Sequence, residues 1–107
     1  MSFDPDKTYG ALVKAGEDWA DANAAADALE ETKKSVLAKL MLESGGKSNA
    51  DKEMIGLADP KYTDFVKSMV EARRTANKMR VRYDSAKTLA ELRRSQESTK
   101  RAEMNIR

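Results

Sequence analysis

Apolar residues recur along two stretches of this chain at alternating steps of three and four residues. The positions are Leu12, Ala15, Trp19, Ala22, Ala26, Leu29, Lys33, Val36 and Leu40 in the first stretch, and Tyr62, Phe65, Met69, Ala72, Ala76, Met79, Tyr83, Ala86 and Ala90 in the second. Only Lys33 departs from the apolar pattern. Such spacing is typical of the a and d positions of a helix that packs against another helix. The two stretches are equally long, about 42 Å each at a rise of about 1.5 Å per residue.

Asp-Pro pairs stand where each of these helices should begin. Asp4-Pro5 precedes the first stretch and Asp59-Pro60 precedes the second. Asp is a favoured N-cap, and Pro suits the first helical position because its missing N–H would have no partner there. We therefore expect helices over about residues 5–43 and 60–104.

The segment between the two stretches contains turn signals and a second kind of cap. Gly45 and Gly46 suit a helix C-cap and a reversal of direction. Ser48, followed three residues later by Asp51, predicts a short helix over roughly residues 50–57. Residues 44–59 are thus expected to form a loop and a short helix.

Two equal helices joined by such a connection predict an antiparallel hairpin. Pairing the apolar positions places Trp19 opposite Met79 and Ala15 opposite Tyr83, so large residues face small ones. The fold class expected is all-α: an antiparallel two-helix coiled-coil hairpin with a short connecting helix, in a single domain of residues 1–107.

Some apolar residues lie outside the two seams. At the loop end, we expect the short helix to fold over as a small core; the residues involved are Leu37, Met41, Val66, Val70, Met54, Ile55 and Leu57. At the other end, Val13, Val81, Leu89 and Leu92 would need the N-terminal segment or a second copy of the chain to cover them. Because a lone hairpin buries little surface, homodimerisation stays open.

Composition narrows the chemistry that is possible. The chain has 107 residues, 36% of them charged, with no Cys and no His. Thiol chemistry, Cys-based zinc sites and the commonest acid–base group are therefore excluded. Gly46-Lys47-Ser48 resembles the end of a phosphate-binding loop, but Met41 stands where that loop needs Gly. We predict no enzymatic activity, catalytic residue, metal, cofactor or small-molecule substrate.

The start of the chain and its hydropathy bear on location. No apolar run approaches the ~18–20 residues that span a bilayer, and the first residues lack the pattern of a signal peptide. We expect a cytoplasmic protein that does not enter a membrane.

Charge is unevenly distributed along the chain. The net charge is +2, but residues 1–72 hold 9 Lys and Arg against 14 Asp and Glu, whereas residues 73–107 hold 11 against 4. The cations that form or broaden one basic stripe on the second helix are Arg73, Arg74, Lys78, Arg80, Arg82, Lys87, Arg93, Arg94, Lys100 and Arg101. Five of these recur every seven residues, from Arg73 to Arg101, and therefore share one helix face.

Two interpretations of the stripe are possible. Its cations can pair with acids of the first helix, such as Asp18, Asp27 and Glu30, and so orient the hairpin. Alternatively, they bind a nucleic acid or an acidic protein face. The residues we assign to that binding surface are Arg73, Arg74, Arg80, Lys87, Arg93, Arg94, Lys100 and Arg101.

The second helix also resembles a known class of proteins. Its segments Arg80-Val81-Arg82-Tyr83-Asp84, residues 91–99 and Arg101-Ala102-Glu103-Met104 are similar to small helical proteins of tailed phages and prophages, often encoded among recombination or replication genes. This resemblance supplies no catalytic residues. It implies an accessory protein made in the bacterial host cytoplasm.

Three functions follow as hypotheses. The first is a non-enzymatic accessory to phage DNA metabolism, acting on DNA or a DNA-handling protein complex through the basic face. The second is an inhibitor of a host defence nuclease, similar to an anti-CRISPR protein, and the third is a structural coiled-coil scaffold.

Overall fold

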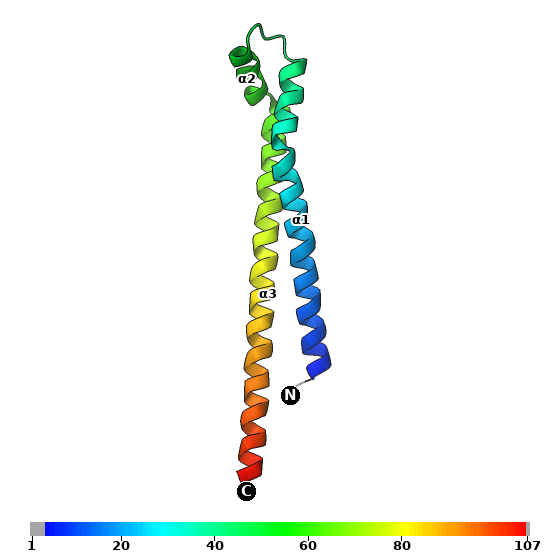
Figure 1. Ribbon diagram of the computed structural model, residues 1–107, viewed down its shortest axis with the longest axis vertical. Coiled ribbons are helices and arrows are strands. Elements are labelled where there is room, and N and C mark those ends of the chain that lie inside the picture. The colour runs from blue at the N-terminus through cyan, green and yellow to red at the C-terminus, as the bar shows by residue number, and fades with distance from the viewer. Residues whose placement is uncertain (1–3, 107) are drawn as a thin grey trace. The chain divides into compact units, whose positions relative to one another are not determined.

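The computed structural model describes residues 4–106, and these form three helices and no strand (Figure 1). The helices are α1 (Pro5–Glu43), α2 (Asn49–Ala58) and α3 (Pro60–Ile106). These bounds agree with the expected helices to within two residues, and the all-α hairpin is confirmed. Two compact units result: a loop unit of Ala22–Ala76, and a terminal unit of Met1–Asp21 with Asn77–Arg107.

The Asp-Pro caps of α1 and α3 are confirmed. The carboxylate of Asp4 accepts hydrogen bonds from the backbone N–H of Asp6 at 3.0 Å and of Lys7 at 3.3 Å. The carboxylate of Asp59 accepts one from the N–H of Lys61 at 2.8 Å. Each cap thus satisfies N–H groups that have no partner within the first helical turn.

The cap of α2 is also confirmed. The hydroxyl of Ser48 accepts a hydrogen bond from the N–H of Asp51 at 3.1 Å, and the Asp51 carboxylate accepts one from the N–H of Lys47 at 3.1 Å. These reciprocal bonds fix where α2 begins.

The expected glycine C-cap of α1 is wrong. No glycine in the described residues has the positive φ that such a cap requires. Instead, the hydroxyl of Ser44 donates to the carbonyl of Met41 at 2.7 Å. Gly46 is needed for a different reason, because a Cβ there would lie 2.9 Å from the backbone nitrogen of Lys52. The glycine allows the chain to fold back closely onto α2.

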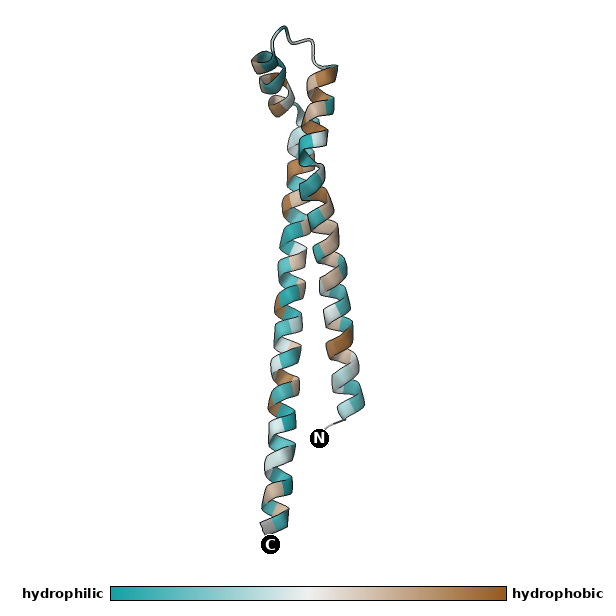
Figure 2. Ribbon diagram, in the orientation of Figure 1, coloured by the Kyte–Doolittle hydropathy of each residue, from teal (hydrophilic) through white to brown (hydrophobic). Residues whose placement is uncertain are grey.

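In the loop unit, the core lies between α1 and α3 and is built from small residues. Ala26 and Ala76 are 0% and 1% exposed, and Leu40 is 7% exposed. In this unit the other seam positions are half-buried, except Lys33, which is exposed. Apolar residues concentrate where α1 ends, close to α2 (Figure 2). The predicted seam therefore holds this unit together.

The short helix α2 packs through its glycine and not through its large apolar side chains. Gly56 is buried, and a Cβ added to it would lie 3.0 Å from Cδ1 of Leu37. Met54 is 70% exposed, and Ile55 and Leu57 are also exposed. The expected small core is wrong for these three residues and for Val70 of α3, which is 54% exposed, because the close approach of α2 to α1 is made at Gly56 and not at these side chains.

In the terminal unit, α1 and α3 also run antiparallel. The rings of Trp19 and Tyr83 stack with centroids 5.5 Å apart. Gly16 makes room for Tyr83, since a Cβ at Gly16 would lie 3.2 Å from the Tyr83 ring. Tyr83 thus lies beside Gly16, one residue from Ala15, which is the residue that the predicted register places opposite it. α3 continues past the first turn of α1 (Figure 1).

Among residues 4–106, no helix combines the length and the apolar content that crossing a membrane would require.

Candidate functional site

Arg73, the first residue of the basic stripe, is bound within the loop unit. Its guanidinium donates two hydrogen bonds of 2.9 Å to the two carboxylate oxygens of Glu30. It also donates to Asp27 and, at 2.7 Å, to the side-chain oxygen of Asn23. The planar fork of arginine suits such bidentate pairing with a carboxylate. For Arg73, Asp27 and Glu30, the intramolecular pairing considered from the sequence is therefore the one observed.

This cluster favours the charged forms of Arg73 and Glu30. Hydrogen bonds to Glu30 and Asp27 raise the pKa of Arg73. Hydrogen bonding from Arg73 holds the pKa of Glu30 below its usual value, against the opposing effect of desolvation. A partner would have to displace these contacts to reach Arg73, so we place it outside the candidate surface.

Among residues 4–106, Asp18 does not pair with a cation of α3. Its carboxylate accepts a hydrogen bond from Lys14 of the same helix at 3.4 Å, and the expectation that it pairs across the hairpin is wrong. The two residues are four apart on exposed helix surface, where such a pair contributes little.

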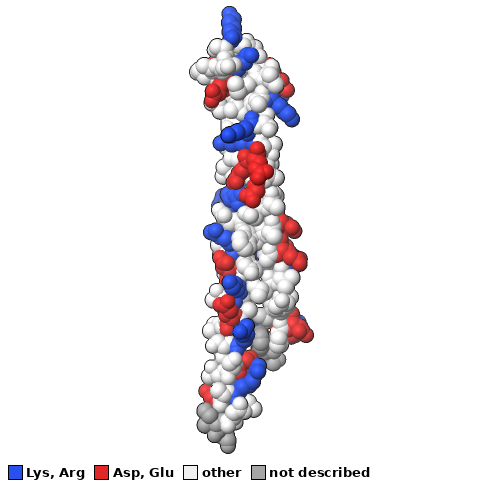
Figure 3. Space-filling view, in the orientation of Figure 1, with Lys and Arg blue, Asp and Glu red and all other residues white. Residues whose placement is uncertain are grey.

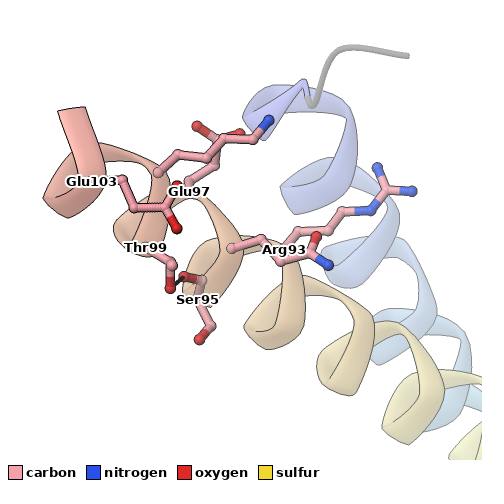
Figure 4. Close-up of a pocket in the computed structure, with 7 residues that line it drawn as sticks. Arg93, Ser95, Glu97, Thr99 and Glu103 are labelled. Atoms are coloured by element: carbon pink, nitrogen blue, oxygen red, sulfur yellow. Dashed lines mark hydrogen bonds between the residues drawn. The ribbon is translucent and has the colours of Figure 1, made fainter.

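Arg74 and Arg93 also have contacts. Arg74 lies 3.9 Å from Glu71, with both side chains about two-thirds exposed, so this contact leaves Arg74 accessible. Arg93 is half-buried and makes a contact of its own. In Figure 4 its side chain extends toward the first turns of α1, whereas Ser95 and Thr99 project from α3 on the other side.

Five further cations of the predicted surface are exposed and form no ion pair in the described part of the chain. These are Arg80, Lys87, Arg94, Lys100 and Arg101, all on α3 in the terminal unit. The terminal unit therefore carries the cations of the predicted surface that are exposed and, within residues 4–106, form no ion pair.

Three of these five residues line one groove between α3 and the first turns of α1. We call it the basic groove; its volume is about 580 Å³, and its lining residues are Pro5, Thr8, Tyr9, Leu12, Tyr83, Lys87, Ala90, Glu91, Arg94, Glu97 and Arg101. Leu12, Tyr83 and Ala90 are half-buried, whereas Tyr9 is 68% exposed. The groove thus combines an apolar floor with a cationic side.

The basic groove also contains acidic residues. Glu91 is exposed and Glu97 is half-buried, and both lie between cations along α3. Figure 3 shows this alternation, with Lys and Arg interspersed with Asp and Glu along the later part of α3. The groove therefore offers a pattern of both signs, not a uniformly positive surface.

Three other hollows in the terminal unit are formed by α3 alone. One is lined by Arg93, Lys100, Glu103 and neighbouring polar residues, whose side chains in Figure 4 point to several sides of one helix, so it is an open helix surface. A second is lined by Glu91, Arg94, Ser95 and Ser98. The third contains Val81, Leu89 and Leu92, which are 59%, 46% and 54% exposed. We call these three residues the outer stripe, because they face away from the Tyr83 side of α3.

The predicted site residues thus separate into groups. Lys87, Arg94 and Arg101 come together in the basic groove, as their seven-residue spacing indicated. Arg80 and Lys100 are exposed on α3 outside it. Sequence reasoning missed the contribution of α1, whose Tyr9 and Leu12 form the apolar part of the groove; Leu12 began the predicted seam, but nothing showed which cations it would meet.

Within residues 4–106, no three acidic side chains come together in a way that could hold a metal ion.

Comparison with known proteins gives no relative for this chain. No family model matches it, and neither a curated protein nor a solved structure is significantly similar to it.

Proposed function

We propose that this protein is a non-enzymatic phage accessory protein that binds DNA or a DNA-handling protein complex through the basic residues of α3. The observation that carries the proposal is that five cations of the predicted surface are exposed on α3 and form no ion pair among the described residues: Arg80, Lys87, Arg94, Lys100 and Arg101. The resemblance of the second helix to phage proteins supplies the biological setting.

Electrostatics support a binding role for these cations. Where α1 carries acids opposite α3, as at Asp27 and Glu30, the facing arginine is neutralised within the chain. The five exposed cations have no such partner among the described residues. Exposed cations on one helix attract an anionic surface and raise the rate of encounter with it.

A mobility-shift titration with duplex DNA tests the nucleic-acid form of this proposal. If all five cations contact phosphates, the logarithm of the affinity should fall with the logarithm of salt concentration with a slope of about −4.5. Changing Arg80, Arg94 and Arg101 to Gln should reduce that slope to about −2. The matched control changes Lys33, Lys34 and Lys39, three exposed lysines of the loop unit, to Gln and should behave as wild type.

The protein form of the proposal has its own measurement. Purified recombination and replication proteins of a phage host would be immobilised and tested for binding the wild-type chain and the same two triple variants. If neither DNA nor these proteins bind at low salt, or if the two triple variants bind equally well, the proposed function is wrong.

Inhibition of a host defence nuclease, as by an anti-CRISPR protein, is a second candidate. The mixed charge and apolar floor of the basic groove favour it, because protein faces offer both features. Adding the purified chain to a target-cleavage reaction should lower cleavage in proportion to the chain added. Unchanged cleavage by representative nuclease complexes would contradict this candidate.

A structural scaffold is a third candidate, favoured by the outer stripe. Val81, Leu89 and Leu92 are spaced by eight and three residues, which places them on one face of α3 where they could pack against a helix of a second copy. Light scattering should then show dimers that Val81→Glu with Leu92→Glu dissociates. A monomer at all concentrations would contradict the scaffold function.

A further inference from the structure

We propose that the basic groove binds an acidic amphipathic helix of a partner protein, and this inference rests on the proposed function because it specifies the partner of the same surface. The juxtaposition that points to it is an apolar floor, formed by Leu12 and Ala90, beside cations that recur every seven residues.

The floor of the groove requires an apolar occupant. Leu12, Tyr83 and Ala90 are half-buried, so each still presents part of its surface to the groove. Tyr9 on α1 is 68% exposed and lines the same groove. A tyrosine in this setting gives a partner a rigid apolar contact with a polar tip.

The cations define the spacing that the occupant must match. Lys87, Arg94 and Arg101 stand about 10.5 Å apart along α3, at about 1.5 Å per residue. A helix lying along α3 presents side chains to it at the same seven-residue interval. Acids at that interval on the occupant would meet all three cations, over a length of about 21 Å.

The acids of the groove favour a protein helix over DNA. Glu91 and Glu97 lie among the cations, and a phosphate backbone, which carries only negative charge, would be repelled by both. A helix can place a Lys or Arg opposite each of them. DNA would also gain little from Tyr9 and the apolar floor.

The described helices leave space for this occupant. Beyond Ala90, the half-buried positions of α3 become polar, as at Glu97, so the apolar packing of α1 on α3 ends there. α3 itself continues to Ile106 (Figure 1). A partner helix can therefore take up a position along α3 that α1 does not fill.

The test uses fluorescence polarisation with the full chain and a labelled, designed helical peptide of about five turns, or about 18 residues. The peptide carries Leu at its a and d positions and Glu at one flanking position in every heptad. A control peptide has the same composition with its Glu residues moved to the opposite face. A short DNA duplex is the competing ligand.

Three variants locate the binding site. Arg94→Gln with Arg101→Gln should weaken peptide binding by about tenfold or more, because two charge pairs are lost. Tyr9→Ala should weaken it by about tenfold while leaving DNA binding unchanged. The matched control, Lys78→Gln with Arg82→Gln, removes the same charge from α3 outside the groove and should stay within about twofold of wild type.

The outcomes separate this inference from the function on which it rests. Equal binding of the two peptides, or equal effects of the groove and control variants, would overturn the inference. DNA binding that falls with Arg94→Gln and Arg101→Gln, without any peptide binding, would overturn it while supporting the proposed function. Binding of neither peptide nor DNA at low salt would overturn the inference, and the protein-capture assay then decides the proposed function separately. Circular dichroism of each variant shows whether its helices are intact.

Discussion

Substitutions of Leu40 and Leu42 test whether side chains buried in the seam stabilise the loop unit. The two leucines lie two residues apart on α1, with 7% and 83% of their surfaces exposed. Full burial of a leucine side chain contributes about 1.5–3 kcal/mol, and truncation adds the loss of packing around the resulting cavity. Leu40→Ala should therefore lower the free energy of unfolding by about 2–4 kcal/mol. Leu42→Ala should change it by less than about 0.5 kcal/mol.

Urea unfolding followed by far-UV circular dichroism measures both changes. With a slope of about 2 kcal/mol per molar, in the middle of the range for small proteins, Leu40→Ala should lower the midpoint by about 1–2 M. Because the two substitutions remove the same atoms from the same helix, helix propensity cancels between them. Equal shifts for the two variants, or a larger shift for Leu42→Ala, would refute the burial argument and with it the predicted a/d seam in this unit.

Three further predictions concern the turn, the Arg73 cluster and the basic groove. Gly46→Ala should destabilise the chain by about 1–3 kcal/mol in the same urea assay, because its Cβ would meet the Lys52 backbone. Gly45→Ala, which has open space around it, should be nearly neutral. Equal effects of the two substitutions would argue against the close approach of Gly46 to Lys52. The interaction with Arg73 lowers the pKa of Glu30 in the folded state, so the stabilisation from this carboxylate is present above the unfolded pKa of about 4.5 and is lost as pH falls through the lower folded pKa. The difference in urea midpoint between wild type and Glu30→Gln should therefore shrink as pH falls below the unfolded pKa. A difference that stays constant with pH would contradict this linkage. Trp19 is the only tryptophan, and it stacks on Tyr83, which lines the basic groove. Adding the acidic peptide should therefore change tryptophan emission saturably in wild type. The same peptide concentrations should leave the emission of the Arg94→Gln, Arg101→Gln variant unchanged.

The helices and their ends could be predicted from the sequence because their causes are local. A cap such as Asp59 acts on N–H groups two or three residues away, and a seam repeats within one helix. The predictions that failed depend on close contacts between segments. Neither the approach of Gly46 to Lys52 nor that of Gly56 to Leu37 leaves a periodic signal, so the glycine C-cap and the small core at α2 were expected wrongly.

The candidate surface was predictable only in part, for a related reason. Seven-residue spacing places Lys87, Arg94 and Arg101 on one helix face, whatever lies opposite. Whether a cation on that face is accessible depends on the other helix. The sequence supplied Asp27 and Glu30 as possible partners for a flanking cation, but it did not show that Asn23 would complete the site around Arg73.

The residues of α1 therefore decide which arginines of α3 can serve a partner. In the loop unit, α1 places Asn23, Asp27 and Glu30 against Arg73, and all of its hydrogen-bonding nitrogens are engaged. In the terminal unit, α1 lines the groove beside Arg94 with Pro5, Thr8, Tyr9 and Leu12, none of which can neutralise a guanidinium. The same heptad repeat on α3 thus yields a structural contact in one unit and accessible charge in the other. Replacing Thr8 by Glu should consequently weaken peptide binding in the basic groove without unfolding α1, since an acid of α1 would then compete with those of the peptide for Arg94.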